Sequence, residues 1–160
     1  MSKFCIIKLK NINAFEDKEC LFQKIEEELS IHKLTCFEHK SESLIKEENT
    51  EYISLADSKE YDNCEMFLLP DGCFNNGETN SIPFSERMNI IKNLIIKVQP
   101  FVQSFEIFMG ECASNKEDFI DLNCSLEEFP KIAEKRFYSK ETFVLEELHF
   151  IINNIQTDSL

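Results

Sequence analysis

An amphipathic helix with a proline at each end is the feature that most constrains how this chain can fold. The apolar side chains between Pro83 and Pro100 recur every three to four residues, and they are Phe84, Met88, Ile91, Leu94, Ile95 and Val98. Pro83 suits the first turn of a helix, where a backbone N–H has no acceptor, and Pro100 ends the helix. Residues 105–109 then alternate as in a strand that lies inside a sheet. The two elements together predict a helix lying flat on a sheet.

Further strands and helices are predicted on both sides of this pair. Residues 4–9 carry bulky side chains on both alternating faces, which is typical of a central strand covered on both sides. A helix is expected at about 14–30 from its apolar spacing. Three short runs rich in β-branched or aromatic residues are predicted to form strands of an antiparallel meander; they are 34–38, 51–56 and 65–69.

The carboxyl-terminal third is predicted to hold two more helices. Ser125-Leu126-Glu127-Glu128 matches a capping box, which indicates a helix at about 126–137. Residues 144–155 have apolar side chains at helical spacing and predict a C-terminal helix, although 143–145 could also begin a strand. The resulting order predicts one α+β domain over residues 1–160, a mostly antiparallel sheet with helices packed on it, and a ferredoxin-like split βαβ core is the first alternative.

The composition excludes several classes of protein. Thirty acidic residues against 17 basic ones give a formal net charge of -13, which opposes a surface that binds nucleic acid or an anionic membrane. The first ten residues lack the long apolar stretch of an export signal, and no run of about 18 apolar residues predicts a membrane span. Seven cysteines form an odd set without a CxxC pair. A reduced, cytoplasmic protein is therefore expected.

No motif predicts catalysis or a cofactor. Three glycines are too few for the phosphate loops GxGxxG and GxxxxGK[ST], and neither motif occurs. The spacing of His32, Cys36 and His39 would suit zinc on one helix, but a turn leading into a strand would splay these side chains apart. The expectation is a protein that is not an enzyme, with no catalytic residue, no cofactor and no metal.

Acidic residues are concentrated in two segments. Residues 41–62 hold seven acids against two lysines, and residues 104–128 hold seven acids against one lysine. The carboxylates predicted to bind a partner are Glu47, Glu48, Glu51, Asp57, Glu60, Asp62, Glu111, Glu117, Asp118 and Asp121. Such a surface attracts basic proteins and speeds their encounter. The alternative is that both segments are solvated surfaces that keep the protein in solution.

The chain resembles small cytosolic immunity proteins of bacterial toxin systems. The resemblance rests on Asn80-Ser81-Ile82-Pro83-Phe84 leading into a helix, on the strand at 104–111 that follows, and on the acidic segment after it. It implies a protein that binds one cognate toxin, here a basic nuclease-type domain, and blocks its active site. Two alternatives stay open. One is a small enzyme or ligand-binding domain with a pocket, and the other is an adaptor or oligomeric subunit whose apolar C-terminal helix docks on a partner.

Overall fold

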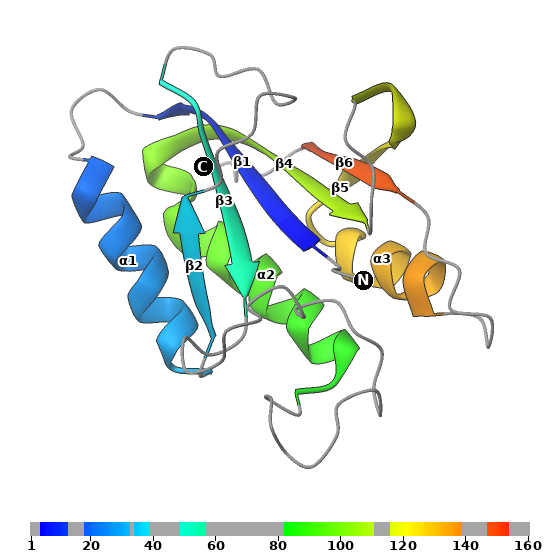
Figure 1. Cartoon of the computed structure of the whole chain (residues 1–160), viewed down its shortest axis with the longest axis horizontal. Helices are drawn as coiled ribbons and strands as arrows, with labels where there is room; N and C mark the ends of the chain where they lie inside the picture. Colours follow the sequence, from blue (N-terminus) through cyan, green and yellow to red (C-terminus); the bar gives the residue numbers. More distant parts are fainter. Residues whose placement is uncertain are drawn as a thin grey trace.

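The computed structural model describes residues 4–12, 18–32, 34–38, 49–56, 82–110, 116–138 and 147–153 (Figure 1). Its elements are, in chain order, β1 (Phe4–Ile12), α1 (Lys18–Ser30), β2 (Thr35–Glu38), β3 (Glu51–Ala56), α2 (Phe84–Val98), η1 (Gln99–Phe101), β4 (Val102–Gly110), η2 (Lys116–Asp118), β5 (Ile120–Ser125), α3 (Phe129–Tyr138) and β6 (Leu148–Asn153). The described residues form a single α+β arrangement, as the sequence predicts.

The six strands make one mixed, mostly antiparallel sheet in the order β2-β3-β1-β4-β6-β5. All neighbouring strands are antiparallel except β5 and β6, which are parallel. The first four strands and first two helices follow the order βαββαβ with β1 and β3 in the middle, which is the ferredoxin-like arrangement considered from the sequence. The unit β5-α3-β6 extends this sheet beyond β4.

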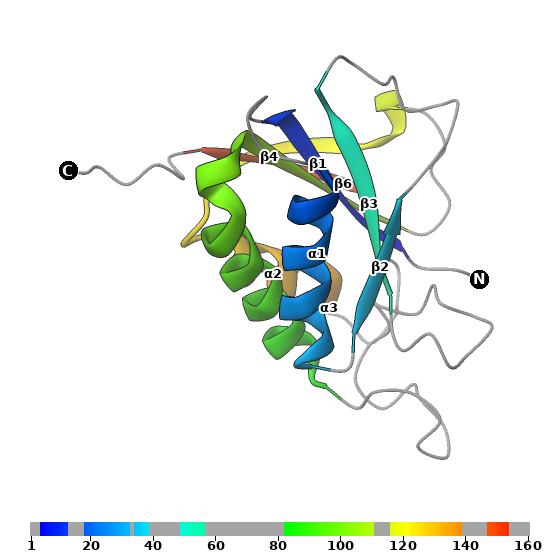
Figure 2. The ribbon, with the colours of Figure 1, turned by 90° about the vertical axis from the view of Figure 1, so that its left-hand side faces the viewer.

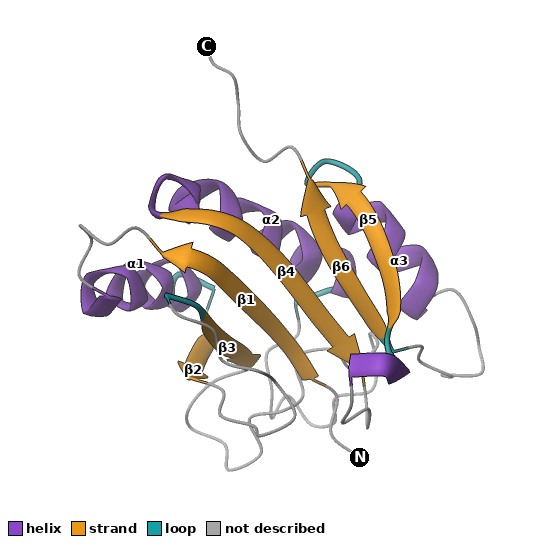
Figure 3. Ribbon diagram, turned by 90° about the horizontal axis from the view of Figure 1, so that it is seen from above, coloured by secondary structure: helices purple, strands orange, loops and turns teal. Residues whose placement is uncertain are grey.

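Helices α1, α2 and α3 all lie on one side of the sheet (Figures 2 and 3). The side chains of Cys5, Ile7 and Leu9 in β1 point to this side and are at most 1% exposed. The apolar stripe predicted between Pro83 and Pro100 is buried along α2. Strands β1 and β4 both lie inside the sheet, so the predictions of a central first strand and an internal strand at 105–109 are confirmed.

The other face of the sheet carries a second, smaller buried cluster. Ile6, Tyr52 and Phe108 come from β1, β3 and β4, and the half-buried Phe119 packs against them. Since β1 is buried on both faces, its first half has apolar side chains at the consecutive positions 4–7 instead of a polar alternation. This face also buries several polar side chains, and these form the site described below.

The predicted C-terminal helix at 144–155 is wrong. Residues 148–153 form strand β6 and not a helix, because Leu148, Phe150 and Ile152 point together into the main core. The intervening His149 is buried as well, so the segment lacks the polar face that would have marked a strand. Strand β5 was not predicted at all. The expected strand at 65–69 lies outside the described residues.

The capping box before α3 is confirmed. The Ser125 backbone N–H donates to Glu128 Oε1 at 3.0 Å, and the Glu128 backbone N–H donates to Ser125 Oγ at 3.1 Å. The helix begins at Phe129, after a turn over residues 126–128. Replacing Ser125 with alanine removes the cap acceptor and is expected to lower the free energy of unfolding by about 1 kcal/mol in urea denaturation. An effect below about 0.3 kcal/mol would show that the box is not used.

Candidate functional site: a buried charge row and an acidic edge

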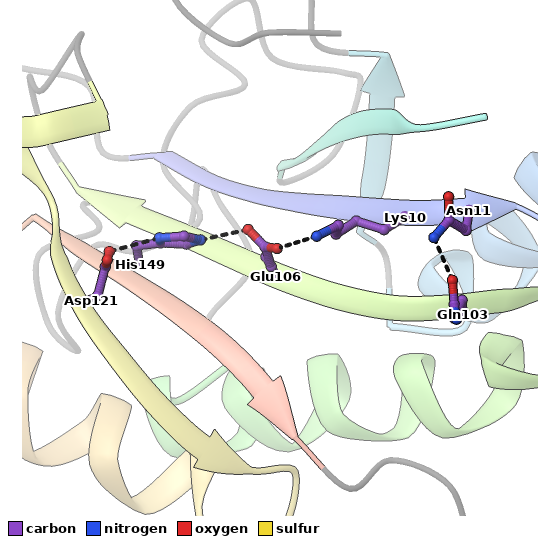
Figure 4. Close-up of polar contacts among 6 residues, drawn as sticks. All are labelled: Lys10, Asn11, Gln103, Glu106, Asp121 and His149. Carbon is purple, nitrogen blue, oxygen red and sulfur yellow. Dashed lines mark hydrogen bonds and ion pairs between the residues drawn. The ribbon is translucent and has the colours of Figure 1, made fainter. Parts of the chain in front are cut away.

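A row of charged side chains crosses the sheet on the face opposite the helices (Figure 4). From β5 to β1, Asp121 Oδ1 lies 2.8 Å from His149 Nδ1, His149 Nε2 lies 2.7 Å from Glu106 Oε1, and Glu106 Oε2 lies 3.1 Å from Lys10 Nζ. The register places these residues together, because His149 is the partner of Asp121 in β5 and of Phe108 in β4. Asp121, His149, Glu106 and Lys10 are called the charge row here.

His149 is the centre of the row and is held on every side. Its side chain is only 2% exposed, and its ring stacks face to face on Phe108 at a centroid distance of 4.2 Å. Each ring nitrogen of His149 therefore faces a carboxylate oxygen, and these two contacts together with the stacking on Phe108 hold the ring in one orientation.

Glu106 is the buried acid of the row, with its side chain 10% exposed. Burial alone raises the pKa of a carboxyl group, but hydrogen bonds from His149 and Lys10, together with the charge of Lys8, lower the pKa of Glu106 to about 2. Lys8 is the cross-strand partner of Glu106 and also lies over the Tyr52 ring, with its Nζ 5.5 Å from the ring centroid. The negative charge of Glu106 is therefore matched by cations on both sides.

The row connects four strands of the sheet. Both nitrogens of His149 are already engaged by Glu106 and Asp121, so neither is free to act as a base for a substrate. Of the two acids in the row, Asp121 is the one exposed to solvent, with its side chain 59% exposed. In chemical terms the row ties β1, β4, β6 and β5 together by charge.

Two of the described thiols, those of Cys5 and Cys124, are poorly suited to nucleophilic chemistry. Burial, together with the charge of Glu128, raises the pKa of Cys124 to about 11. Burial also raises the pKa of Cys5 well above its usual range. A thiol attacks as the thiolate, so both groups are held in an unreactive form. Over the described ranges, no cluster of three His, Cys, Asp or Glu side chains could hold a metal ion.

A second feature is the outer edge of the sheet, which β5 forms. Five carboxylates occur between residues 117 and 128 with no basic residue among them. They are Glu117, Asp118, Asp121, Glu127 and Glu128, all on exposed residues, and together with β5 they are called the acidic edge. The first two lie in η2 at one end of β5, and the last two lie in the turn at its other end. Of these, Glu127 is paired with Lys92 of α2 at 3.0 Å.

The carboxylates predicted to bind a partner do not all reach this edge. Glu117, Asp118 and Asp121 do, but Glu51 is 5% exposed inside β3 and cannot serve as a surface charge. Strand β3 is separated from β5 by β1, β4 and β6. The remaining candidates lie outside the described residues, and they are Glu47, Glu48, Asp57, Glu60, Asp62 and Glu111.

No protein-family model, curated protein or solved structure matches the chain. Its function is therefore inferred from the geometry of the charge row and the acidic edge. Over the described ranges, no helix has both the length and the apolar character needed to cross a bilayer.

The sequence patterns do not predict the charge row. Glu106 belongs to a segment identified only as acidic, and His149 belongs to the segment 144–155 that is predicted to be a helix. A signal was available in β4, where Glu106 stands in an apolar strand between Phe105 and Ile107. An ionisable residue in the middle of such a strand requires a partner when it is buried, which predicts an opposite charge on a neighbouring strand.

Proposed function

We propose that this protein neutralises a basic toxin domain by binding it through the acidic edge. The observation that carries the proposal is a set of five carboxylates from Glu117 to Glu128, uninterrupted by a basic residue, with Asp121 on the edge strand β5 and the other four in the segments at its two ends. It extends along a strand of six residues, which spans about 20 Å.

Electrostatic complementarity is the physical basis of the proposal. Enzymes that cleave nucleic acids bind phosphates with basic side chains, so an anionic protein edge competes for the same surface. Opposite charges also accelerate encounter, which matters for an inhibitor that must act before its target does damage. The resemblance to immunity proteins, drawn from the sequence, implies the same role.

The two alternative functions receive less support from the described residues. An enzyme site built around His149 would need an available base or nucleophile, but both nitrogens of His149 are occupied and the thiols of Cys5, Cys36 and Cys124 are buried; of the described cysteines, Cys20 is the exposed one. The adaptor hypothesis depended on an apolar C-terminal helix. In the described part of this segment, residues 148–153 form a buried internal strand in place of the expected helix.

The test uses a double charge reversal at the end of the edge. Glu117 and Asp118 are both exposed, so E117K/D118K changes the charge without disturbing the core. We expect it to weaken partner binding at least about tenfold, and we expect wild-type binding to weaken when salt rises from about 50 to about 500 mM. The matched control is E27K/E86K, which makes the same change in net charge on exposed positions of α1 and α2.

The experiment begins with the immobilised chain and an extract of its own host cells. A retained protein is identified, then produced alone and together with each variant. Support requires that it arrest growth when made alone, and that wild type and E27K/E86K restore growth while E117K/D118K does not. A retained protein without toxicity, or equal protection by E117K/D118K, would contradict the proposal.

A further inference from the structure

The outer side of β5 presents backbone groups that no described segment pairs with. The Ile120 backbone N–H donates to the Glu147 carbonyl at 2.8 Å, so the backbone groups of Ile120 face β6. Successive residues of a strand direct their N–H and C=O groups to opposite sides. The backbone groups of Asp121 and Asn123 therefore face outward, away from the sheet. At Ser125 the N–H is taken by Glu128, and the open stretch ends there.

An open edge of this kind is a template for another strand, and proteins usually block it. The opposite edge of this sheet is a strand of only four residues, β2. The β5 edge is longer and is flanked by carboxylates at both ends. These charges repel a second copy of the same chain, because the copy would bring the same carboxylates against them. They attract a strand that carries lysine or arginine.

We infer that β5 is a docking edge for an extended, basic segment of a partner protein, which adds a seventh strand by backbone pairing at Asp121 and Asn123. This inference rests on the proposed function and specifies how the toxin is bound. Main-chain hydrogen bonds would supply affinity, and alternate side chains would supply specificity. The Asp121 carboxylate is 59% exposed beside this edge and would meet a basic side chain of the added strand.

The decisive variant is Asn123→Pro. Proline removes the outward N–H, while the inward hydrogen bonds of β5 belong to Ile120, Leu122 and Cys124 and stay intact; proline is accepted on edge strands for this reason. Asn123→Ala is the matched control, because it removes the same side chain and keeps the N–H. Both variants are first checked for wild-type circular dichroism and thermal stability.

The probe is a synthetic peptide of about eight residues that alternates lysine and valine, long enough to run along β5. We expect it to bind wild type and N123A equally, to bind N123P about tenfold more weakly, and to slow amide hydrogen exchange at Asp121 and Asn123. A peptide of the same charge with N-methylated alternate amides cannot pair its backbone. It is expected to lose binding to wild type as well, which tests the inference even if N123P fails to fold.

Equal binding of the N-methylated and unmethylated peptides, or exchange that stays unchanged at Asp121 and Asn123, would overturn the inference. The toxin assay separates this failure from that of the proposed function. If N123P still protects cells and E117K/D118K does not, the partner uses the carboxylates but does not add a strand. If the edge forms dimers of this chain, seen as a doubled mass in solution, the occupant is a second copy and the inference is wrong.

Discussion

Replacing His149 with phenylalanine is expected to lower the free energy of unfolding by about 3 kcal/mol, measured by urea denaturation at neutral pH. Phenylalanine has nearly the same shape and can keep the stacking on Phe108. What it loses is the pair of hydrogen bonds to Glu106 and Asp121. Most of the expected loss of stability comes from Glu106, because its buried carboxylate would then keep only the lysines of β1 as counter-charges.

The control for this prediction is built into the charge row. Asp121 accepts from the other nitrogen of the same ring, but its side chain is 59% exposed, so water can replace the lost partner. D121N should therefore cost less than about 1 kcal/mol. If H149F and D121N destabilised the protein equally, the burial of Glu106 would not be what makes His149 necessary.

A double variant identifies the interaction that is lost. With Gln at position 106, no buried carboxylate loses its hydrogen-bond donor when His149 becomes phenylalanine, so H149F should cost at least about 1 kcal/mol less in the E106Q background. Costs that simply add would mean that the imidazole acts only as a packing group on Phe108.

Several elements of the core could be predicted because each has a pattern in its own stretch of sequence that indicates its structure. The apolar side chains of α2 between two prolines fit the period of a helix. The bulky side chains on both alternating faces of β1 fit a strand. The capping box at Ser125 was equally clear, because its two hydrogen bonds are made between residues three positions apart. These elements depend on residues that are close together in the sequence, so one sequence is enough to predict them.

Strands β5 and β6 could not be predicted in the same way. In β6, Leu148 and Phe150 face the main core while His149 is buried on the other face, so apolar bulk follows no single period. In β5 the exposed Asp121 and Asn123 have low strand propensity and read as a loop. Both strands are stable through pairing with each other, and β6 also pairs with β4. Such long-range pairing leaves no local pattern.

The candidate site shows the same difference between features set by local sequence and features set by long-range pairing. Charge counting named Glu117, Asp118 and Asp121 of the acidic edge as candidates, because charge density is a property of composition along a segment, but it did not name Glu127 and Glu128. It also included Glu51, which is buried, since counting does not separate a core acid from a surface acid. Charge counting could not predict the charge row, because Glu106 and His149 are 43 positions apart in the sequence and meet only through the pairing of β4 with β6.

Acid is expected to remove the stabilising contribution of Glu106 over a defined range of pH. Its pKa falls from an ordinary value of 4.5 to about 2 in the folded protein, so the folded state binds a proton less readily than the unfolded chain. The contribution is therefore complete above about pH 4.5 and is lost as the pH falls toward about 2. Its full size is on the order of 3 kcal/mol.

The comparison between wild type and E106Q isolates this contribution from that of the other acids. Urea denaturation followed by far-ultraviolet circular dichroism suits the measurement, because the chain has no tryptophan. Near neutral pH the wild type should be more stable by about 3 kcal/mol, and the difference should shrink steadily below about pH 4.5 and be nearly gone at about pH 2. D121N, whose acid is exposed, should show a small difference at every pH. A gap between wild type and E106Q that stayed constant from neutral pH to about pH 2 would mean that Glu106 is not held ionised by His149 and Lys10, and the charge row would lose its physical basis.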